Sequence, residues 1–268
     1  MTVPAGSSAT PVTGASPVAA LDDVTLMYGD VLAAHDITFD VRPGEFVSLI
    51  GPSGCGKSSV LRAIGGLMPA ATGEVAVNGL SVTSPRPDEI SFVFQDLALY
   101  PWRSAVRNVE IALQFAGAPR RERRERALDA LTRVGLGDVA NRYPHQLSGG
   151  MRQRVAIARA LVSDAKLLLL DEPFAALDEQ SRLNIGAQLI AILEEEGKTV
   201  VFVTHSLSEA AYLSDRVVVM GPRPGNIREI IDVPLERPRH TSLMREPAFH
   251  DLTDRLSALL YTDDEDAP

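Results

Sequence analysis

The order of apolar and polar residues predicts alternating strands and helices in the first third of the chain. In residues 21–41, apolar side chains recur at every second position, which is typical of antiparallel strands. Residues 46–50 form an almost continuous apolar run, as in a strand buried on both faces, and residues 57–67 have the period of a helix. Further strands are expected at residues 74–77 and 90–94.

The middle of the chain predicts a group of helices, and the later part returns to alternation. Helical periodicity is present at residues 106–115, 120–134 and 151–162. In chain order, the elements that follow are a strand at 167–170, a helix at 178–195, a strand at 199–204, a helix at 206–213 and a strand at 217–220. Such alternation favours a parallel α/β core with a helical insertion.

The last segment predicts a hairpin and one more helix. Residues 221–240 are rich in Pro and Arg around a short apolar stretch, which favours a terminal hairpin. An amphipathic helix is expected behind Pro247, and its apolar side consists of Phe249, Leu252, Leu256 and Leu259. No internal repeat is visible, so a single module is expected.

Composition and charge narrow the class of partner. The 268 residues are 45% hydrophobic and 23% charged, which is ordinary for a globular protein with a sizeable core. The net charge is −9, and basic residues are scattered except at residues 120–126, where they mix with acids as on a solvated helix face. A nucleic-acid partner is therefore not expected. The one cysteine, Cys55, allows no intramolecular disulfide and is typical of a reducing cytoplasm.

Neither end of the chain predicts a targeting signal or a membrane anchor. Residues 1–17 have neither the basic nor the apolar region of a secretory signal, and their composition predicts a disordered tail. Residues 262–266 predict a solvated acidic end. No apolar run approaches the roughly 20 residues that a membrane-spanning helix needs.

Residues 51–58 match the phosphate-binding pattern Gly-x-x-x-x-Gly-Lys-Ser between a predicted strand and a predicted helix. Glycine adopts the positive φ angles that let backbone N–H groups surround phosphate oxygens, and the helix directs its positive end at the nucleotide. Lys57 is expected to reach the β- and γ-phosphates, and Ser58 is expected to bind Mg²⁺. The predicted ATP-binding residues of this loop are Gly51, Pro52, Ser53, Gly54, Cys55, Gly56, Lys57, Ser58 and Ser59.

Two carboxylates, Asp171 and Glu172, directly follow the strand predicted at residues 167–170. Ligands of α/β sheets bind at the carboxyl ends of the strands. Asp171 is therefore expected to lie where the Mg²⁺ of a bound nucleotide sits. The turn after the strand lets Glu172 reach the γ-phosphate and polarise an attacking water.

The block Leu147-Ser148-Gly149-Gly150-Met151, which precedes a helical run, resembles the signature motif of ABC-type ATPases, with Met151 in place of the usual Gln. The resemblance extends from residue 21 to about residue 231. It implies an α/β fold with a P-loop NTPase core, an antiparallel β subdomain and a helical ABC signature subdomain. The expected divisions are an ATPase domain at 18–240, its helical subdomain at about 96–163, and a C-terminal helix with an acidic tail at 241–268.

The same resemblance implies roles for single residues. Glu172 is expected to be the catalytic carboxylate, and His205 the switch histidine that contacts the γ-phosphate. Gln95 corresponds to the Q-loop glutamine, which joins Mg²⁺ or the attacking water. Tyr28 corresponds to the residue that stacks on adenine, although a tyrosine at a strand end can instead belong to the core.

A second copy of the chain is also implied. Ser148 is well placed as the N-cap of the following helix, and with Gly149 and Gly150 it offers an anion site. In ABC proteins this site faces the γ-phosphate of the ATP that the other subunit holds. Asp178 matches the loop that bridges the two active sites. Two chains would then enclose two ATP molecules with their Mg²⁺ ions.

Shorter motifs resemble the ATP-binding subunits of nitrate, sulfonate and taurine importers. These motifs are Gln95-Asp96, Tyr100-Pro101-Trp102-Arg103, Asn108-Val109 and Arg223-Pro224-Gly225. The resemblance implies integral membrane permease subunits, an extracytoplasmic solute-binding protein and a peripheral place on the cytoplasmic face of the membrane. Trp102 is either a permease contact or a buried residue of the helical subdomain. An exporter ATPase is the alternative function, whereas the interval between Lys57 and Ser148 is too short for the coiled-coil insertion of a DNA-repair ATPase.

The sequence allows two interpretations of Cys55. Its position among phosphate-loop N–H groups, at a helix N-terminus and near Lys57, favours a reactive thiolate that bound MgATP shields, and this is our prediction. The alternative is a small side chain that is turned away from the nucleotide, buried and inert.

Overall fold

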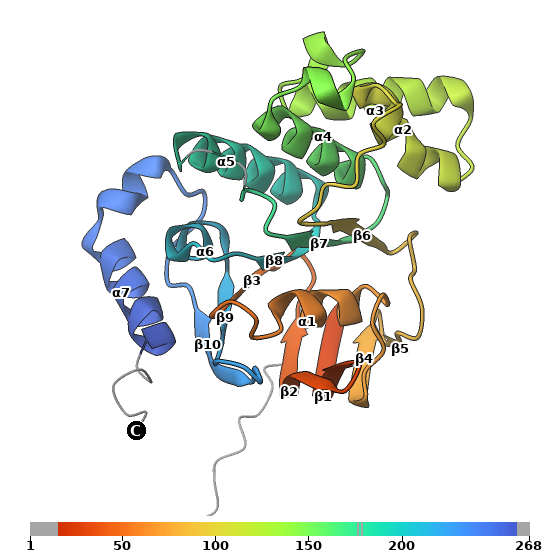
Figure 1. Cartoon of the computed structure of the whole chain (residues 1–268). Coiled ribbons are helices and arrows are strands. Elements are labelled where there is room, and N and C mark those ends of the chain that lie inside the picture. Colours follow the sequence, from red (N-terminus) through yellow and green to blue (C-terminus); the bar gives the residue numbers. More distant parts are fainter. Residues whose placement is uncertain (1–15, 176, 178, 262–268) are drawn as a thin grey trace, which may run out of the picture.

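Two β-sheets form the framework of the computed structural model (Figure 1), which describes residues 16–175, 177 and 179–261. The tail predicted at residues 1–17 lies outside this part except at its last two positions, and so do Asp178 and residues 262–266. The smaller sheet is antiparallel, with strand order β2-β1-β4-β5. Its strands are β1 (Ala19–Tyr28), β2 (Val31–Val41), β4 (Thr72–Val77) and β5 (Leu80–Ser81).

The larger sheet has the strand order β10-β9-β3-β8-β7-β6. Neighbouring strands in it are parallel, except that β10 is antiparallel to β9. Every residue of β3, β7, β8 and β9 is buried, which explains their largely apolar sequences. Because β3, β8 and β7 are neighbours, the segments that follow them meet at one edge of the sheet. The strands are β3 (Phe46–Ile50), β6 (Ile90–Val93), β7 (Leu167–Asp171), β8 (Thr199–Val203), β9 (Arg216–Met220) and β10 (Ile227–Asp232).

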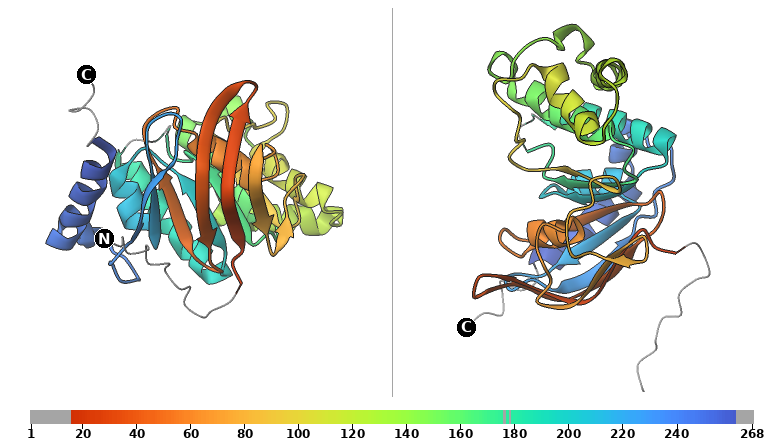
Figure 2. Two further views of the ribbon diagram at one scale, coloured as in Figure 1. Left: turned by 90° about the horizontal axis from the view of Figure 1, so that it is seen from below. Right: turned by 90° about the vertical axis from the view of Figure 1, so that its right-hand side faces the viewer.

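Helices pack on both sides of the larger sheet. The first helix, α1 (Lys57–Ile64), lies between the two sheets and contacts β1, β4, β7 and β8 (Figure 1). Three helices pack together at one end of the molecule (Figure 2), namely α2 (Ala105–Phe115), α3 (Arg120–Arg133) and α4 (Gly149–Leu161). The others are η1 (Gly137–Val139), η2 (Pro144–Gln146), α5 (Glu179–Glu196), α6 (Leu207–Leu213), η3 (Thr241–Arg245) and α7 (Pro247–Tyr261).

Side chains of the larger sheet divide between two hydrophobic cores. In β3, Val47 and Leu49 join the core that contains α1 and the smaller sheet. Phe46 and Ile50 join the core that contains residues of α2 to α7. This division follows from the alternating direction of side chains along a strand. The sheet thereby ties the phosphate loop, which follows β3, to both halves of the molecule.

Most predicted elements are confirmed, and three details differ. The helix predicted at residues 57–67 ends at Ile64, because Gly65 and then Gly66, with φ +70°, follow it. The hairpin predicted for residues 221–240 begins earlier, since this segment supplies only its loop and its second strand, β10, which pairs antiparallel with β9 at the edge of the larger sheet. The strand β5 has two residues, which is too short to produce a pattern in the sequence.

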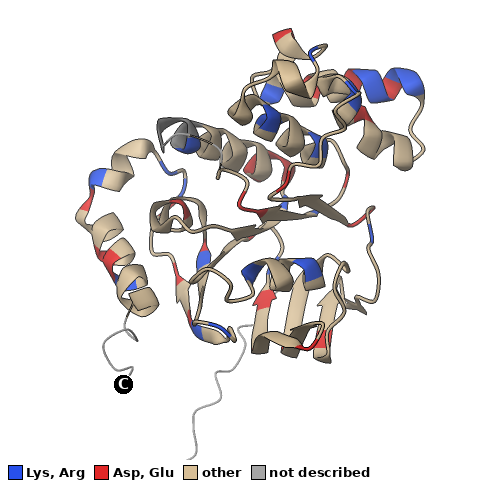
Figure 3. Cartoon of the chain, in the orientation of Figure 1, with Lys and Arg blue, Asp and Glu red and all other residues tan. Residues whose placement is uncertain are grey.

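One expectation about the surface is also met in the described part of the chain. Basic and acidic residues are mixed along α3 (Figure 3), as predicted for residues 120–126. Across residues 16–175 and 179–261, no helix combines the length and the hydrophobicity required to span a bilayer.

Candidate active site

The phosphate loop connects β3 to α1. Gly56 is the N-cap of α1 with φ +96°, and a Cβ atom there would lie 2.8 Å from the carbonyl oxygen of Ala33 in β2. Glycine is required because this position combines a left-handed conformation with a close backbone contact. The Nζ of Lys57 donates hydrogen bonds to the carbonyl oxygens of Gly51 (2.8 Å) and Pro52 (2.9 Å). The loop is thus folded around its own lysine.

A cavity of about 450 Å³ opens beside this loop. The predicted site residues that line it are Tyr28, Ser53, Gly54, Gly56, Lys57, Ser58, Ser59, Gln95, Glu172 and His205. Val31, Ala33 and Arg223 line it as well, although the sequence did not indicate them. Groups that suit phosphates and groups that suit a planar base therefore share one cavity.

Ser58 and Asp171 come from different elements and form a hydrogen bond. The Ser58 hydroxyl, in the first turn of α1, donates to Oδ1 of Asp171 at the end of β7 over 2.8 Å. Asp171 is 2% exposed. Burial raises the pKa of its carboxyl group, and the hydrogen bond from Ser58 opposes this rise. A hydroxyl and a carboxylate side by side are oxygen donors of the kind that Mg²⁺ prefers.

Glu172 contacts the two other residues that were predicted to be catalytic. Its Oε2 accepts a hydrogen bond from Nε2 of Gln95 (3.1 Å), and its Oε1 contacts Nε2 of His205. Glu172 has φ +48°, so the chain turns sharply where β7 ends. Its N–H donates to the carbonyl oxygen of Val203 (3.0 Å), which ties this turn to the end of β8. The order of the strands thus brings three distant segments together.

The signature block lies apart from this cavity. Ser148 is the N-cap of α4, as predicted, and its hydroxyl accepts a hydrogen bond from the N–H of Met151 (3.2 Å). Gly149 and Gly150 form the first turn of the helix. A Cβ atom on Gly150 would lie 2.6 Å from Cδ2 of Leu177, so the block packs closely on the segment that follows Glu172. None of Ser148, Gly149 and Gly150 lines the cavity that contains Lys57.

Tyr28 and Trp102, for which the sequence allowed either a buried or an exposed position, are both exposed. Tyr28 ends β1 at the cavity and is 73% exposed, so the alternative that placed it in the core is wrong. Trp102 is 70% exposed, which excludes burial in the helical group. The turn that presents Trp102 is fixed by Asn108, which accepts a hydrogen bond from the N–H of Tyr100 (2.7 Å) and donates to the carbonyl oxygen of Arg103 (2.9 Å).

Cys55 is not the reactive thiolate that we predicted. Its side chain is completely buried, and a Cβ atom on Gly51 would lie 2.7 Å from its sulfur. Burial raises the pKa of the thiol, although Lys57, with Nζ 3.8 Å from the sulfur, acts in the opposite direction. The structure therefore supports the alternative of a buried side chain, and its low reactivity stays a prediction.

The loop between β9 and β10 is the part of the site that the sequence did not indicate. Gly225 donates to the carbonyl oxygen of Ala33 (3.2 Å) and accepts from the N–H of His35 (2.8 Å). A Cβ atom on Gly225 would lie 1.8 Å from the carbonyl oxygen of Cys55, so this loop presses directly on the phosphate loop. It places Arg223 on the cavity wall. The motif Arg223-Pro224-Gly225 was visible as a family resemblance, but its place in the fold was not.

Comparisons with known proteins agree with this arrangement. The ABC transporter family profile matches residues 34–175. The nitrate import ATP-binding protein NrtC of Synechococcus elongatus is 45% identical over 85% of this chain and 35% of its own length. The taurine import ATP-binding protein TauB of Rhizobium johnstonii is 41% identical over 89% of this chain and 93% of its own. A dimeric, post-hydrolysis structure of the ATP-binding cassette MJ0796 with ADP and Pi has a TM-score of 0.73 and 35% identity, covering 81% of this chain and 100% of that one.

The family match and the fold support the same conclusion as the site. The two-sheet architecture with its helical group is the ABC cassette fold of MJ0796. The predicted α/β class and the predicted ATPase activity are confirmed. This chain belongs to the ABC transporter family, as an ATP-binding subunit that hydrolyses ATP.

Proposed function

We propose that this chain powers the import of nitrate, taurine, a sulfonate or a similar small solute through separate permease subunits. The relatives named for nitrate and taurine import support this proposal, because the similarity covers most of the chain. The chain would lie at the cytoplasmic face of the membrane, and an extracytoplasmic solute-binding protein would deliver the solute to the permease. The exposed Trp102, on a turn fixed by Asn108, supports a permease contact in this region.

The contact of Glu172 with Gln95 and His205 is the observation that carries the catalytic assignment. In this assignment, Glu172 orients and polarises the attacking water, and His205 stabilises charge on the γ-phosphate. Lys57 leaves the carbonyl oxygens of its loop to bind the β- and γ-phosphates. Tyr28 stacks on adenine at the exposed end of the cavity.

Ser58, Asp171 and Gln95 would hold Mg²⁺ between them and the phosphates. The Mg²⁺ ion, when bound, neutralises developing charge on the β- and γ-phosphate oxygens. The hydrogen bond between Ser58 and Asp171 supports this assignment, because it already places two oxygen donors together. Asp171 must be ionised to serve as a ligand, and its burial makes ionisation less favourable until a cation is present.

A second copy of the chain would complete each site. Ser148, Gly149 and Gly150 start a helix whose N–H groups can bind the γ-phosphate of ATP in the other copy. Asp178 would lie between the two sites. The dimeric structures of MJ0796 support this arrangement, and Ser148 lies outside the cavity of its own chain, as the arrangement requires.

The direction and class of transport can be tested in cells that lack this gene. The gene would be deleted from its source organism, and uptake of labelled nitrate, taurine and an alkanesulfonate would be measured. We expect uptake of one of these solutes to be lost and to return with the wild-type gene but not with a Glu172→Gln gene. Normal uptake of all three, together with lost efflux of a solute, would instead show an exporter.

A further inference from the structure

Arg182, near the start of α5, uses three nitrogens on three different partners. Its Nε donates to the carbonyl oxygen of Leu177 (2.9 Å), and its Nη2 donates to the carbonyl oxygen of Ala175 (3.5 Å). Its Nη1 lies 3.8 Å from Oε1 of Glu209 in α6. One guanidinium group therefore joins the segment that follows Glu172 to the helix that follows His205.

Glu209 in turn fixes the short segment that carries His205. The Thr204 hydroxyl donates to Oε2 of Glu209 and accepts a hydrogen bond from the N–H of Ser206 (3.0 Å). Ser206 is the N-cap of α6, and its hydroxyl accepts from the N–H of Glu209 (3.2 Å). Both neighbours of His205 are thus tied to Glu209, Thr204 through its carboxylate and Ser206 through its backbone N–H.

The same residues surround a small cavity of about 180 Å³, which Glu172 and His205 also line. Its lining consists of Glu172, Phe174, Ala175, Arg182, Thr204, His205, Ser206 and Glu209. A movement of the segment that contains Ala175 and Leu177 would therefore reach His205 through Arg182 and Glu209. Leu177 itself packs on Gly150 of the signature block, which extends this series of contacts to α4.

The ion pair between Arg182 and Glu209 contributes little to the stability of the fold. Glu209 is 6% exposed, and burial raises its pKa above the usual value even with Arg182 nearby. Relative to the unfolded chain, ionisation of Glu209 therefore costs the folded chain stability, and this cost appears as the pH rises from the ordinary pKa through the raised one. The pair with Arg182 thus adds little net stability, as is common for buried ion pairs.

We propose that Arg182 and Glu209 are positioning residues, which couple the segment at Ala175 and Leu177 to the place of His205 beside Glu172. The proposal rests on the proposed roles of Glu172 and His205. It assigns a function to two charged residues that do not line the nucleotide cavity. Packing of the signature block on Leu177 would then influence the position of the switch histidine.

Glu209→Gln is the decisive variant, because the amide keeps an oxygen that can accept from Thr204 while the charge is removed. In MgATP hydrolysis by the purified full-length chain, we expect kcat to fall roughly tenfold, with KM for ATP changed less than about twofold. The melting temperature should stay the same or rise. Arg182→Lys should lose a similar share of kcat, because a single ammonium group cannot donate to Ala175 and Leu177 while facing Glu209. The double variant Arg182→Lys with Glu209→Gln should lose little more than either single variant.

Arg133→Ala is the matched control, because Arg133 is also partly exposed and pairs with Glu195 and Glu196 at the other end of α5. Its kcat should equal that of the wild type. If Glu209→Gln has the kcat of the wild type while His205→Ala is inactive, the positioning role of Arg182 and Glu209 is overturned but the proposed role of His205 is not. Two other results would also overturn the positioning role of the pair. One is a loss of kcat that parallels a loss in melting temperature, and the other is a loss in the double variant equal to the product of the two single losses. Wild-type kcat in His205→Ala would instead overturn the proposed role of His205.

Discussion

Cys55 lies in the phosphate loop two residues before Lys57, yet its side chain has no exposed surface. Burial raises its pKa, so the thiol is protonated at neutral pH and reactive thiolate forms only above the pH range of an ordinary cysteine. We predict that a maleimide labels the folded chain slowly at pH 7, at the same rate with and without MgATP. Labelling of Cys55 should become faster only at a pH higher than the pH at which an exposed cysteine reacts.

The control for this measurement is the denatured chain, in which Cys55 should react at once. Mass spectrometry of the labelled protein gives both rates. Rapid labelling of the folded chain at pH 7, with protection by MgATP, would restore the reactive-thiolate hypothesis and contradict the burial seen here.

Arg223 is exposed on the wall of the nucleotide cavity, and Lys57 is the other cationic residue that lines it. A solvent-exposed charge contributes about 0.4–1 kcal/mol to such an attraction, so Arg223→Ala should weaken ADP and ATP binding roughly two- to fivefold. Arg223→Lys should restore most of the affinity. Titration with a fluorescent nucleotide measures the effect. Arg107→Ala, an exposed change in α2 outside the cavity, is the control, and unchanged affinity in Arg223→Ala would place Arg223 outside the binding site.

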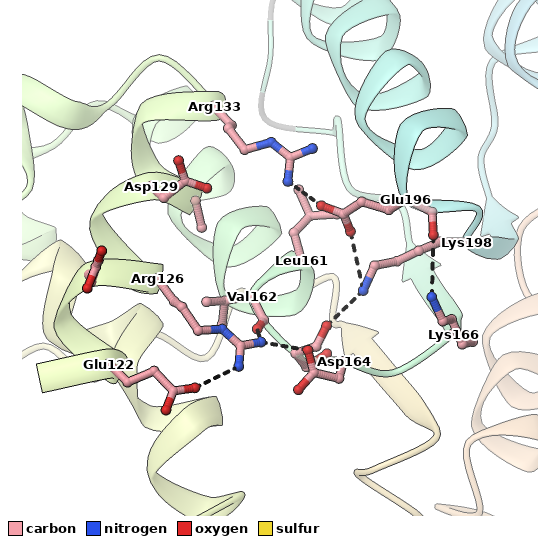
Figure 4. Close-up of a pocket in the computed structure, with 13 residues that line it drawn as sticks. Glu122, Arg126, Asp129, Arg133, Leu161, Val162, Asp164, Lys166, Glu196 and Lys198 are labelled. Atoms are coloured by element: carbon pink, nitrogen blue, oxygen red, sulfur yellow. Dashed lines mark hydrogen bonds and ion pairs between the residues drawn. The ribbon is translucent and has the colours of Figure 1, made fainter. Parts of the chain in front are cut away.

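At the scale of elements, ion pairs hold the helical group to the rest of the molecule. A cavity of about 870 Å³ lies between α3, the end of α4 and the segment before β8. Figure 4 shows the residues that line it, most of which are charged. Arg126 donates to the carbonyl oxygen of Val162 (2.9 Å) and pairs with Asp164 (2.7 Å). Arg133 pairs with Glu195 (2.9 Å) and with Glu196. These contacts fix α3 against the segment between α4 and β7 and against the end of α5.

We predict that Arg126→Ala lowers the free energy of unfolding by about 0.5–1 kcal/mol, because its partners are largely exposed and water screens them. The loss should be smaller in high salt, since the ion pairs are then weaker in the wild type as well. Urea denaturation at low and high NaCl measures both values. A loss that is the same at both salt concentrations would show that Arg126 acts through packing of its aliphatic stem instead.

The sequence predicted the individual helices and strands more completely than it predicted which of them lie next to one another. Strands such as β3 and β7 were visible because burial on both faces requires a run of apolar residues. The pairing of β10 with β9 was missed, because a six-residue edge strand with one buried position carries no signal for its partner. Gln95, Glu172 and His205 could be named from motifs, but their contact depends on the strand order. Arg223 was missed as a site residue for the same reason.

At the scale of the whole molecule, the proposed site is only half present in one chain. Lys57 lines the nucleotide cavity, whereas Ser148 lies outside it at the start of α4. If two copies face each other, each site takes Lys57 from one chain and Ser148 from the other. A mixed dimer of a Lys57→Ala chain and a Ser148→Arg chain then contains one intact site and one doubly disabled site.

We predict that mixing these two variants restores ATP-dependent dimerisation that neither variant shows alone. Analytical ultracentrifugation with differently labelled chains measures the mixed species. The wild-type chain gives the reference level, and each variant alone gives the background. Absence of mixed dimers at every ratio would show that Lys57 and Ser148 do not act on the same nucleotide.

The proposed mechanism depends above all on Glu172, which would activate the water that attacks ATP at this site. The most direct measurement compares Glu172→Gln with the wild type in ATP hydrolysis, ATP binding and gel filtration with MgATP, using the exposed Glu236→Gln as the control. We expect Glu172→Gln to bind ATP normally, to hydrolyse almost none of it and to elute as an ATP-bound dimer, while Glu236→Gln behaves as the wild type. Hydrolysis by Glu172→Gln at a rate close to that of the wild type would contradict it.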